Sequence, residues 1–202
     1  MAAHVELLVE EPSMEAFLRA LLPRCLPQHT TFEVHPFQGK DDLLGKLLSR
    51  LRGYACWLPE DWRIVVVVDR DDDDCLRLKQ RLDDCATQAG LSTRPRSVGP
   101  RWQVVNRIAI EELEAWYFGD WEAVHASYPR VASTIPQKRQ YRDSDGIAGG
   151  TWEAFERIMQ RGGYFGGGLR KIEVARMLGA VIEPQRNRSP SFRCFHQAVT
   201  QA

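Results

Sequence analysis

The sequence lacks a long apolar run. Its longest strongly apolar stretch, residues 64–68, covers five positions, whereas a helix needs about 20 apolar residues to span a membrane. The N-terminal segment has neither the basic region nor the small-residue cleavage site of a secretory signal peptide. The five cysteines form no Cys-x-x-Cys pair, which argues against a zinc site and against a disulfide framework. We therefore expect a cytoplasmic protein with reduced thiols and no membrane segment.

The chain also lacks a net charge, because 27 basic residues balance 27 acidic ones. The balance is uneven along the sequence. Residues 130–202 carry 12 of the basic and six of the acidic residues, a net charge of +6, so residues 1–129 carry −6. This asymmetry fits a metal-binding core with a flank that faces a polyanion, and it equally fits two halves that neutralise each other.

The length of 202 residues and the hydrophobic content of 44% are ordinary for one domain, or for one domain with an appendage. Strand-like and helix-like periodicities alternate in the first part of the chain, and only helical ones follow. The predicted strands are 4–9, 31–36, 64–68 and 102–110, and the predicted helices are 14–22, 41–51, 76–89, 111–118, 152–159, 169–178 and 191–199. Ser13 is placed to cap the first helix.

These elements predict an α/β fold. The continuous β-branched run at residues 64–68 is typical of a strand covered on both faces, which favours a mainly parallel sheet flanked by helices. We expect this core in residues 1–127. A polar stretch with several prolines and glycines follows, and residues 128–202 are expected to form a helical C-terminal extension packed on the core.

Acidic residues directly follow two of the predicted strands. Glu10 and Glu11 follow the first, and Asp69 ends the third, with four more aspartates at residues 71–74. Ligands of open α/β sheets bind beyond the carboxyl ends of the strands, so these side chains are expected at one edge of the sheet. Close ionised carboxylates repel one another, and a hard cation relieves this repulsion by binding their oxygens. The pattern therefore predicts a site for Mg²⁺, or for Mn²⁺ in its place.

The later aspartates have a second interpretation. Asp72 and Asp74 precede a predicted helix, where acids stabilise the first turn without binding a ligand. Asp69 and Asp71 are better candidates for metal ligands, because the strand stays apolar up to Asp69. Asp73, in the same run, is a further candidate.

Two segments together resemble the Toprim domain, which occurs in topoisomerases, bacterial primases and OLD-family nucleases. They are residues 9–18, Val-Glu-Glu-Pro-Ser-Met-Glu-Ala-Phe-Leu, and residues 65–71, Val-Val-Val-Val-Asp-Arg-Asp. In that domain an apolar strand ends in Glu, and a later apolar strand ends in Asp-x-Asp. Residues 110–116 and 187–192 further resemble a stand-alone Toprim-like family, the domain of unknown function 4276. That resemblance extends over most of the chain and implies a Toprim-like fold.

The resemblance implies that Glu10, Asp69 and Asp71 are the metal ligands and catalytic acids of a Toprim site. The glycine that usually follows the glutamate is Glu11 here. OLD-like enzymes often carry another acid four residues after the glutamate, but that position is a methionine in this chain and Glu15 comes one residue later. Either Glu10 or Glu11 could therefore be the metal glutamate, with Glu15 as its companion.

Two later segments suit an OLD-like nuclease. Glu111 and Glu114, expected on one face of a helix start, could hold a second metal, or they could be ordinary acids of a first helical turn. Lys171, at a helix start after a glycine run, could stabilise charge on a phosphate, or it could be a solvated lysine. The expected contacts of a nucleic-acid backbone are Arg70, Arg107, Arg170, Lys171 and Arg188.

The resemblance implies a Mg²⁺- or Mn²⁺-dependent nuclease that acts on DNA or on RNA such as tRNA. Families of this kind often work beside a separate ABC- or AAA-type ATPase in prokaryotic anti-phage systems, and often as homodimers. Residues 162–168 lack the spacing of a P-loop, so no ATP site is expected in this chain. Two alternatives stay open. One is an inactive Toprim scaffold that binds a partner protein. The other is a phosphatase of the haloacid dehalogenase type, which would need a later acid such as Asp120.

Overall fold

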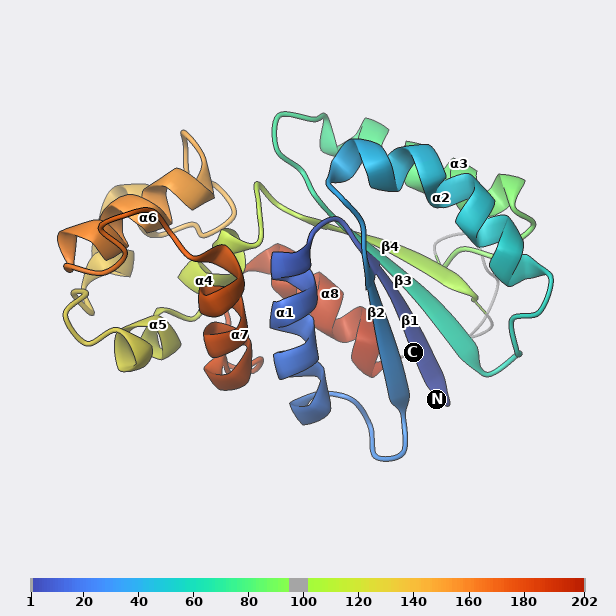
Figure 1. Cartoon of the computed structure of the whole chain (residues 1–202), viewed down its shortest axis with the longest axis horizontal. Helices are drawn as coiled ribbons and strands as arrows, with labels where there is room; N and C mark the ends of the chain where they lie inside the picture. Colours follow the sequence, from blue (N-terminus) through green and yellow to red (C-terminus); the bar gives the residue numbers. More distant parts are fainter. Residues whose placement is uncertain (1, 95–101, 202) are drawn as a thin grey trace.

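The computed structural model describes residues 2–94 and 102–201. Its sheet has four strands in the order β2-β1-β3-β4 (Figure 1). The strands are β1 (His4–Val9), β2 (Thr31–Pro36), β3 (Trp62–Asp69) and β4 (Val104–Ala109). All three pairings are parallel, which confirms the predicted α/β class and is consistent with a Toprim-like fold.

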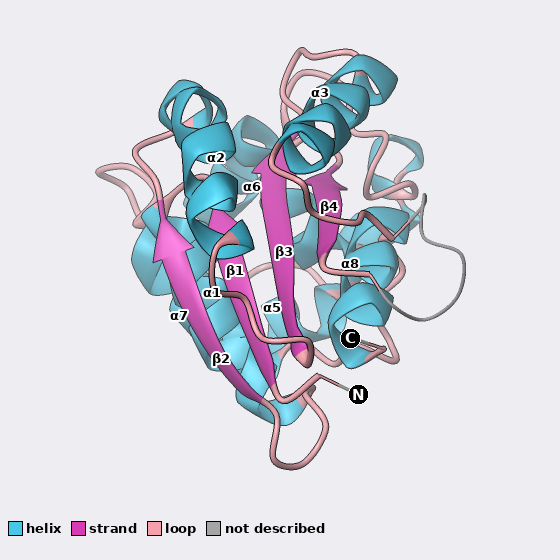
Figure 2. Cartoon of the chain, turned by 90° about the vertical axis from the view of Figure 1, so that its right-hand side faces the viewer, coloured by secondary structure: helices cyan, strands magenta, loops and turns pink. Residues whose placement is uncertain are grey.

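Helices cover both faces of the sheet (Figure 2). One face carries α2 (Lys40–Ala55) and α3 (Cys75–Gln88), and the other carries α1 (Pro12–Leu21) and α8 (Pro190–Thr200). Successive side chains of β3 point to opposite faces. Val66 and Val68 join the hydrophobic cluster beneath α2 and α3, whereas Val65 and Val67 join the cluster beneath α1 and α8. The prediction of a strand buried on both faces is therefore confirmed.

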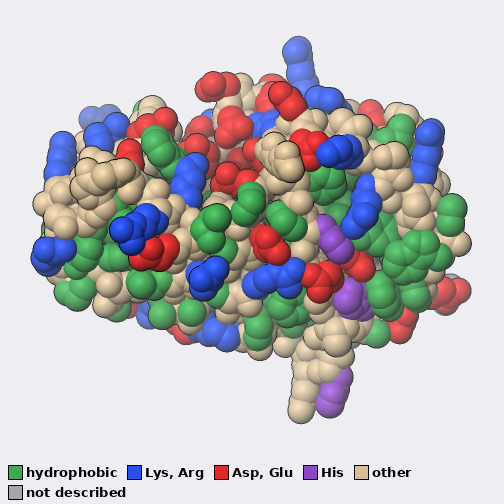
Figure 3. Space-filling model, viewed as in Figure 1, with side chains coloured by type: hydrophobic (Ala, Val, Ile, Leu, Met, Phe, Trp, Pro, Cys, Tyr) green, Lys and Arg blue, Asp and Glu red, His purple; other side chains and the backbone are tan. Residues whose placement is uncertain are grey.

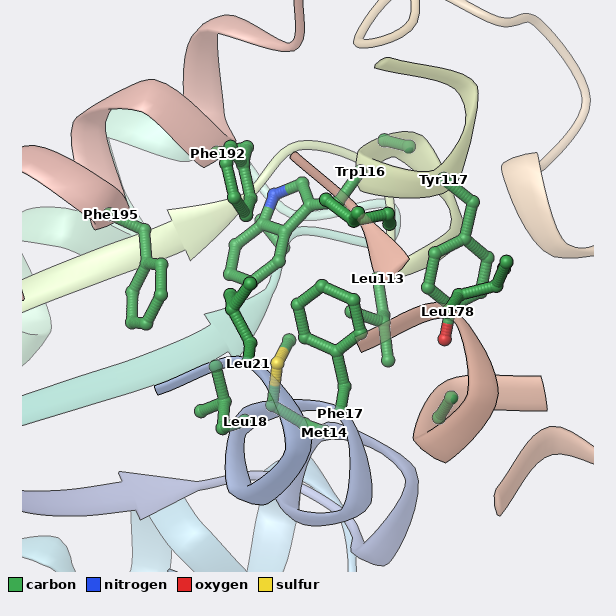
Figure 4. Close-up of a cluster of buried hydrophobic side chains, with 14 of the residues drawn as sticks. Met14, Phe17, Leu18, Leu21, Leu113, Trp116, Tyr117, Leu178, Phe192 and Phe195 are labelled. Carbon is green, nitrogen blue, oxygen red and sulfur yellow. The ribbon is translucent and has the colours of Figure 1, made fainter. Parts of the chain in front are cut away.

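The chain after β4 is helical and packs on the sheet. It forms α4 (Glu114–Gly119), α5 (Trp121–Ser127), α6 (Thr151–Arg161), α7 (Lys171–Val181) and α8, together with the short 3-10 helices η2 (Ile135–Gln137) and η3 (Arg139–Tyr141). Another 3-10 helix, η1 (Leu22–Arg24), directly follows α1. α7 packs along α1, and α8 packs on β4. The indole of Trp116 in α4 contacts Phe17 of α1 and both Phe192 and Phe195 of α8 (Figure 4). One hydrophobic cluster therefore joins the sheet to the C-terminal helices. The boundary between residues 127 and 128 stays a prediction.

Two helix starts differ from the sequence expectation. α1 begins at Pro12 because proline suits the first helical position, so Glu11 is its N-cap residue. Ser13 lies inside the helix, where its hydroxyl donates to Glu11, and the prediction that it caps this helix was wrong. The helix expected from Glu111 begins only at Glu114, because the backbone of Glu111 is left-handed, with φ +53°. A further helix, α5, follows where none was predicted.

None of the helices in the described ranges is long and apolar enough to cross a membrane. All five cysteines are free thiols, and Cys56 and Cys194 are exposed. Burial raises the pKa of the Cys25 thiol to about 11, so this thiol stays protonated at neutral pH.

Candidate functional site

Acidic side chains from three strand ends meet at the carboxyl edge of the sheet. Glu10 follows β1, Asp69 ends β3 and Glu111 lies just after β4. These positions are neighbours because the strands are parallel and in register, with Val67 beside Val9 and Ala109 beside Asp69. We call the acids at this edge the carboxyl-edge cluster: Glu10, Glu11, Asp69, Asp71, Asp73, Glu111, Glu112 and Glu114. Acidic side chains gather at the upper centre of the face seen in Figure 3.

Asp69 is one of the two buried acids of this cluster, with 7% of its surface exposed. Its Oδ1 atom is buried and has no hydrogen-bond partner in the described part of the chain. Burial raises the pKa of Asp69 well above its ordinary value, and the nearby charges of Glu10 and Glu114 raise it further. A buried carboxylate oxygen without a partner is costly, so this atom is a candidate ligand-binding atom.

Glu10 lies directly beside Asp69. Its Oε2 accepts a hydrogen bond from the backbone amide of Asp69 at 3.1 Å. Burial is the main reason why the pKa of Glu10 is raised to about 7, and the charges of Asp71 and Glu11 act in the same direction. Glu10 therefore holds a proton part of the time near neutral pH, and a cation beside it would drive that proton off.

Glu114 approaches the cluster from the first turn of α4. It is 4% exposed, and burial raises its pKa to about 8. Lys171 lowers this pKa and Glu112 raises it, which places both side chains within electrostatic reach of Glu114. The structure thus brings Glu114 and Lys171 to the cluster from the C-terminal helices. The charges of Glu10 and of Glu114 both raise the pKa of Asp69, so both side chains lie within electrostatic reach of it.

Glu111 and Glu112 lie before the first turn of α4. The expectation that Glu111 is an ordinary acid of a first helical turn was therefore wrong. The left-handed backbone of Glu111 puts it in a turn, where its carboxylate pairs with Arg70. Glu112 Oε2 accepts hydrogen bonds from the amide of Trp152, at 2.8 Å, and from the hydroxyl of Thr151, at 3.1 Å. Glu112 therefore caps the start of α6 and ties that helix to the cluster.

A second left-handed residue, Asp71, faces the Glu111 turn. Asp71 has φ +47°, and its amide donates to the carbonyl of Glu111 at 3.0 Å. Non-glycine residues seldom adopt this conformation, which costs about 1–3 kcal/mol, and aspartate is among the more tolerant residues. The two turns after β3 and β4 are thereby held against each other.

Two cations hold acids of the cluster within the structure. The ammonium of Lys40 lies 2.7 Å from Asp71 Oδ2 and 2.9 Å from Asp73 Oδ2, and the guanidinium of Arg70 pairs with Glu111. A third cation, Lys171, lies with its Nζ 5.0 Å from the ring centroid of Trp152. The site therefore combines carboxylates that are already paired with buried ones that are not.

Glu15, Arg107 and Arg170 have partners outside the cluster, and Arg188 lies exposed beside a separate cavity. Glu15 lies 2.8 Å from Arg19, which also pairs with Glu33, so no described contact brings Glu15 into the cluster. Arg107 Nε donates to the carbonyl of Cys194 at 3.0 Å, and Arg170 lies 3.3 Å from Glu173. Arg188 is exposed beside a cavity of about 340 Å³ near Asp120. The roles of these three arginines in nucleic-acid binding stay predictions.

Asp120, the later acid that a haloacid-dehalogenase-type phosphatase would need, is also engaged. It is buried and lies 2.6 Å from the Nε atom of Arg186. It also accepts the backbone amide of Glu183 at 2.8 Å. Asp120 thus joins α4 and α5 to the segment that follows α7, and it is satisfied within the fold.

The donors of the carboxyl-edge cluster fit a divalent cation. Carboxylate oxygens are the ligands that Mg²⁺ and Mn²⁺ prefer, and the partnerless Oδ1 of Asp69 is the atom that such an ion would satisfy. Among the described residues, however, no three histidine, cysteine, aspartate or glutamate side chains are already arranged to hold a metal. Binding would therefore require side chains such as Glu10 and Glu114 to turn toward Asp69.

Sequence reasoning did not identify Lys40. It placed Glu112 at the junction after the fourth strand with Glu111 and Glu114, turned away from these two, but did not predict that Glu112 caps α6. Lys40 is the first residue of α2 and follows the short connection after β2, so it also lies near the carboxyl end of a strand. This position could have identified Lys40 as a candidate site residue. The cap formed by Glu112 carried no such signal, because its partners lie about 40 residues further along the chain.

A family model described as a domain of unknown function (DUF4276) matches residues 9–200 of the chain. Comparisons with curated proteins and with solved structures found no match. The matched residues include the whole carboxyl-edge cluster together with Lys40 and Lys171. The family resemblance inferred from the sequence is confirmed, and this chain belongs to the DUF4276 family.

Proposed function

We propose that the protein is a metal-dependent nuclease of the Toprim type, which cleaves phosphodiester bonds of nucleic acid. The observation that carries this proposal is the buried, partnerless Oδ1 of Asp69, flanked by Glu10 and Glu114 at the carboxyl edge of a parallel sheet. Ligand sites of open α/β sheets lie at this edge. Carboxylates of raised pKa with a specific charged neighbour are typical of functional sites.

The residues of the cluster have distinct parts in this proposal. Mg²⁺ or Mn²⁺, when bound, would polarise the phosphate and lower the pKa of an attacking water. Asp69 and Glu10 would hold the ion, with Glu114 or Glu11 completing the set and Glu10 and Glu114 releasing their protons as they become ligands. Lys171 would stabilise charge on the phosphate from the side of α7. Arg70, which pairs with Glu111, would neutralise part of the substrate backbone.

The substrate class and the partner rest on the resemblance. The Toprim-like strand ends support nucleic acid as the substrate, as DNA or as RNA such as tRNA. The phosphates of all nucleic acids are alike, so contacts of the cluster with phosphate would not distinguish DNA from RNA. A separate ABC- or AAA-type ATPase is the proposed partner, in a prokaryotic anti-phage system.

The test is metal-dependent cleavage of plasmid DNA and of total tRNA in Mg²⁺, Mn²⁺ or EDTA. The variant is Asp69→Ala with Asp71→Ala. The control is Glu60→Ala with Asp61→Ala, which removes two exposed acids just before the other end of β3. We expect cleavage by the wild type and by the control, and none by the Asp69/Asp71 variant or in EDTA. Equal cleavage by all three proteins would refute the proposal.

A catalytically inactive Toprim scaffold that binds a partner protein is the second candidate. It is favoured by the ion pairs of Asp71 with Lys40 and of Glu111 with Arg70, which neutralise two acids of the cluster without a metal. Calorimetric titration with Mn²⁺ separates the two functions. Binding that disappears in the Asp69/Asp71 variant favours the nuclease, whereas no binding at all favours the scaffold.

A further inference from the structure

Lys40 is held at the carboxyl-edge cluster by three oxygen atoms. Its ammonium lies 2.7 Å from Asp71 Oδ2, 2.9 Å from Asp73 Oδ2 and 2.9 Å from the carbonyl oxygen of Arg70. The side chain is 13% exposed although lysine is usually solvated. Three acceptors match the three donors of an ammonium group, so its hydrogen bonding is complete.

The backbone fixes Lys40 next to Glu10. The preceding Gly39 has φ +98°, a conformation that favours glycine. Its amide donates to the carbonyl of Glu10 at 2.9 Å. The start of α2 is thus tied to the end of β1, and Lys40 reaches from there to the turn after β3. A flexible lysine on an unconstrained loop would not be held in this way.

The oxygen donors of the cluster fall into two groups. One group surrounds Asp69, whose Oδ1 is buried and partnerless, with Glu10 and Glu114 close enough to raise its pKa. The other group consists of Asp71, Asp73 and the carbonyl of Arg70, and it is already occupied by the Lys40 ammonium. Among the described residues, the first group forms no ion pair, whereas the second is paired with Lys40.

We infer that Lys40 takes the place of a second divalent cation, so that the site binds one metal ion where neighbouring acid groups would otherwise bind two. This inference rests on the proposed function and states the metal stoichiometry of that same site. A fixed positive charge provides the acids of the β3 turn with a counterion at all times. It also repels a second divalent ion from the space beside it. Lys40 would act on the reaction only indirectly, by holding Asp71, and is therefore a positioning residue.

The test counts bound Mn²⁺ at pH 7.5 in the full chain, by calorimetry and by loss of the electron paramagnetic resonance signal of the free ion. Lys40→Gln removes the charge and keeps hydrogen-bond donors for Asp71 and Asp73, and Lys40→Met serves as a second neutral variant. Lys40→Arg keeps the charge. The matched control is Lys46→Met on the same helix, whose ammonium pairs with Asp42. Circular dichroism and thermal melting establish that each counted variant is folded.

We expect one Mn²⁺ per chain in the wild type, in Lys40→Arg and in Lys46→Met, and two in the neutral Lys40 variants. One ion in a folded Lys40→Gln or Lys40→Met protein overturns the inference, because the ammonium would then be only a structural tether. Two ions in the wild type overturn it as well and leave the proposed nuclease intact. No bound ion in the wild type removes the metal-dependent function and this inference together.

Discussion

Two buried carboxylates on the same sheet have opposite surroundings. Glu6, near the amino end of β1, and Asp69, at the carboxyl end of β3, are almost equally buried, with 6% and 7% of their surfaces exposed. Glu6 accepts a hydrogen bond from the hydroxyl of Tyr54 at 3.0 Å and lies 2.5 Å from His35 Nε2. Asp69 has other carboxylates as neighbours and a partnerless Oδ1.

The difference shows which property marks a candidate site. Burial alone does not, because Glu6 is as deeply buried as Asp69. A buried acid with a full set of partners stabilises the fold, whereas one surrounded by like charges raises the free energy of the folded state. Proteins keep such unfavourable arrangements mainly where a ligand or a reaction depends on them. The predictions below test this distinction, in order of decreasing effect.

The largest expected effect comes from Asp69→Asn. Nucleic-acid cleavage should fall by more than about 1000-fold, as is common for loss of a central catalytic group. The melting temperature of the metal-free variant should rise by about 2–4 °C, because the substitution removes a buried carboxylate from among like charges. Cleavage assays and thermal melting in EDTA check the two parts. A lower melting temperature would mean that Asp69 stabilises the fold as Glu6 does.

Lys171→Met should reduce cleavage by about 100-fold, because the charge that stabilises the phosphate would be lost. The melting temperature and the number of bound Mn²⁺ ions should hardly change, since the lysine is not a metal ligand. Arg176→Met is the control, because Arg176 is an exposed cation on the same helix. Equal rates for both variants would assign Lys171 to the solvated surface.

Glu6→Leu should destabilise the protein by about 1–3 kcal/mol, since it leaves the buried hydroxyl of Tyr54 without its acceptor. Metal binding and cleavage by the folded fraction should be unchanged. In a double-mutant cycle, the variant with both Glu6→Leu and Tyr54→Phe should recover part of the stability lost in Glu6→Leu alone. Chemical denaturation measures each stability. An additive cycle would contradict the view that Glu6 acts through its partners.

The smallest expected effect is on the pH dependence of stability. The folded-state pKa values of Glu10 and Glu114 are raised to about 7 and about 8 from ordinary values near 4.5. Between pH 4.5 and 8 the unfolded chain has released these two protons while the folded chain still holds them, so stability should decrease as pH rises. The melting temperature in EDTA should fall on the order of 5 °C between pH 5 and 8.5.

Saturating Mn²⁺ should make this fall smaller, because the ion replaces the protons on the two carboxylates. The same scan on the Asp69→Asn variant should also give a shallower curve. A melting temperature that rises with pH in EDTA would show that the buried acids are ionised without cost, and the contrast with Glu6 would then disappear.

The sequence was sufficient to predict the sheet and the acids at its edge. Apolar runs that end in Glu10 and in Asp69 identify two strands and the edge at which they end. The parallel pairing then brings the two residues together, as the hydrogen bond between them shows. These features depend on local patterns and on one general rule of α/β folds, so no knowledge of side-chain packing was needed.

The roles of individual acids were less predictable, because they depend on contacts between distant segments. Glu15 was a plausible ligand by spacing, but it pairs with Arg19 four residues away. Glu111 was expected in a helix, but a left-handed turn directs it to Arg70. Lys40 lies 31 residues before Asp71, and only the tertiary fold reveals their ion pair.

The helix that carries Lys171, α7, packs along α1 but is synthesised well after it. All acids of the carboxyl-edge cluster precede residue 115, whereas Lys171 follows Glu114 by 57 residues. At about 5–20 residues per second, a ribosome adds Lys171 roughly 3–11 seconds after Glu114. The helix that covers the sheet beside β4, α8, is made after α7. A nascent chain therefore presents its acids before it has the lysine, and the proposed activity would begin only after α7 has been made and has packed along α1.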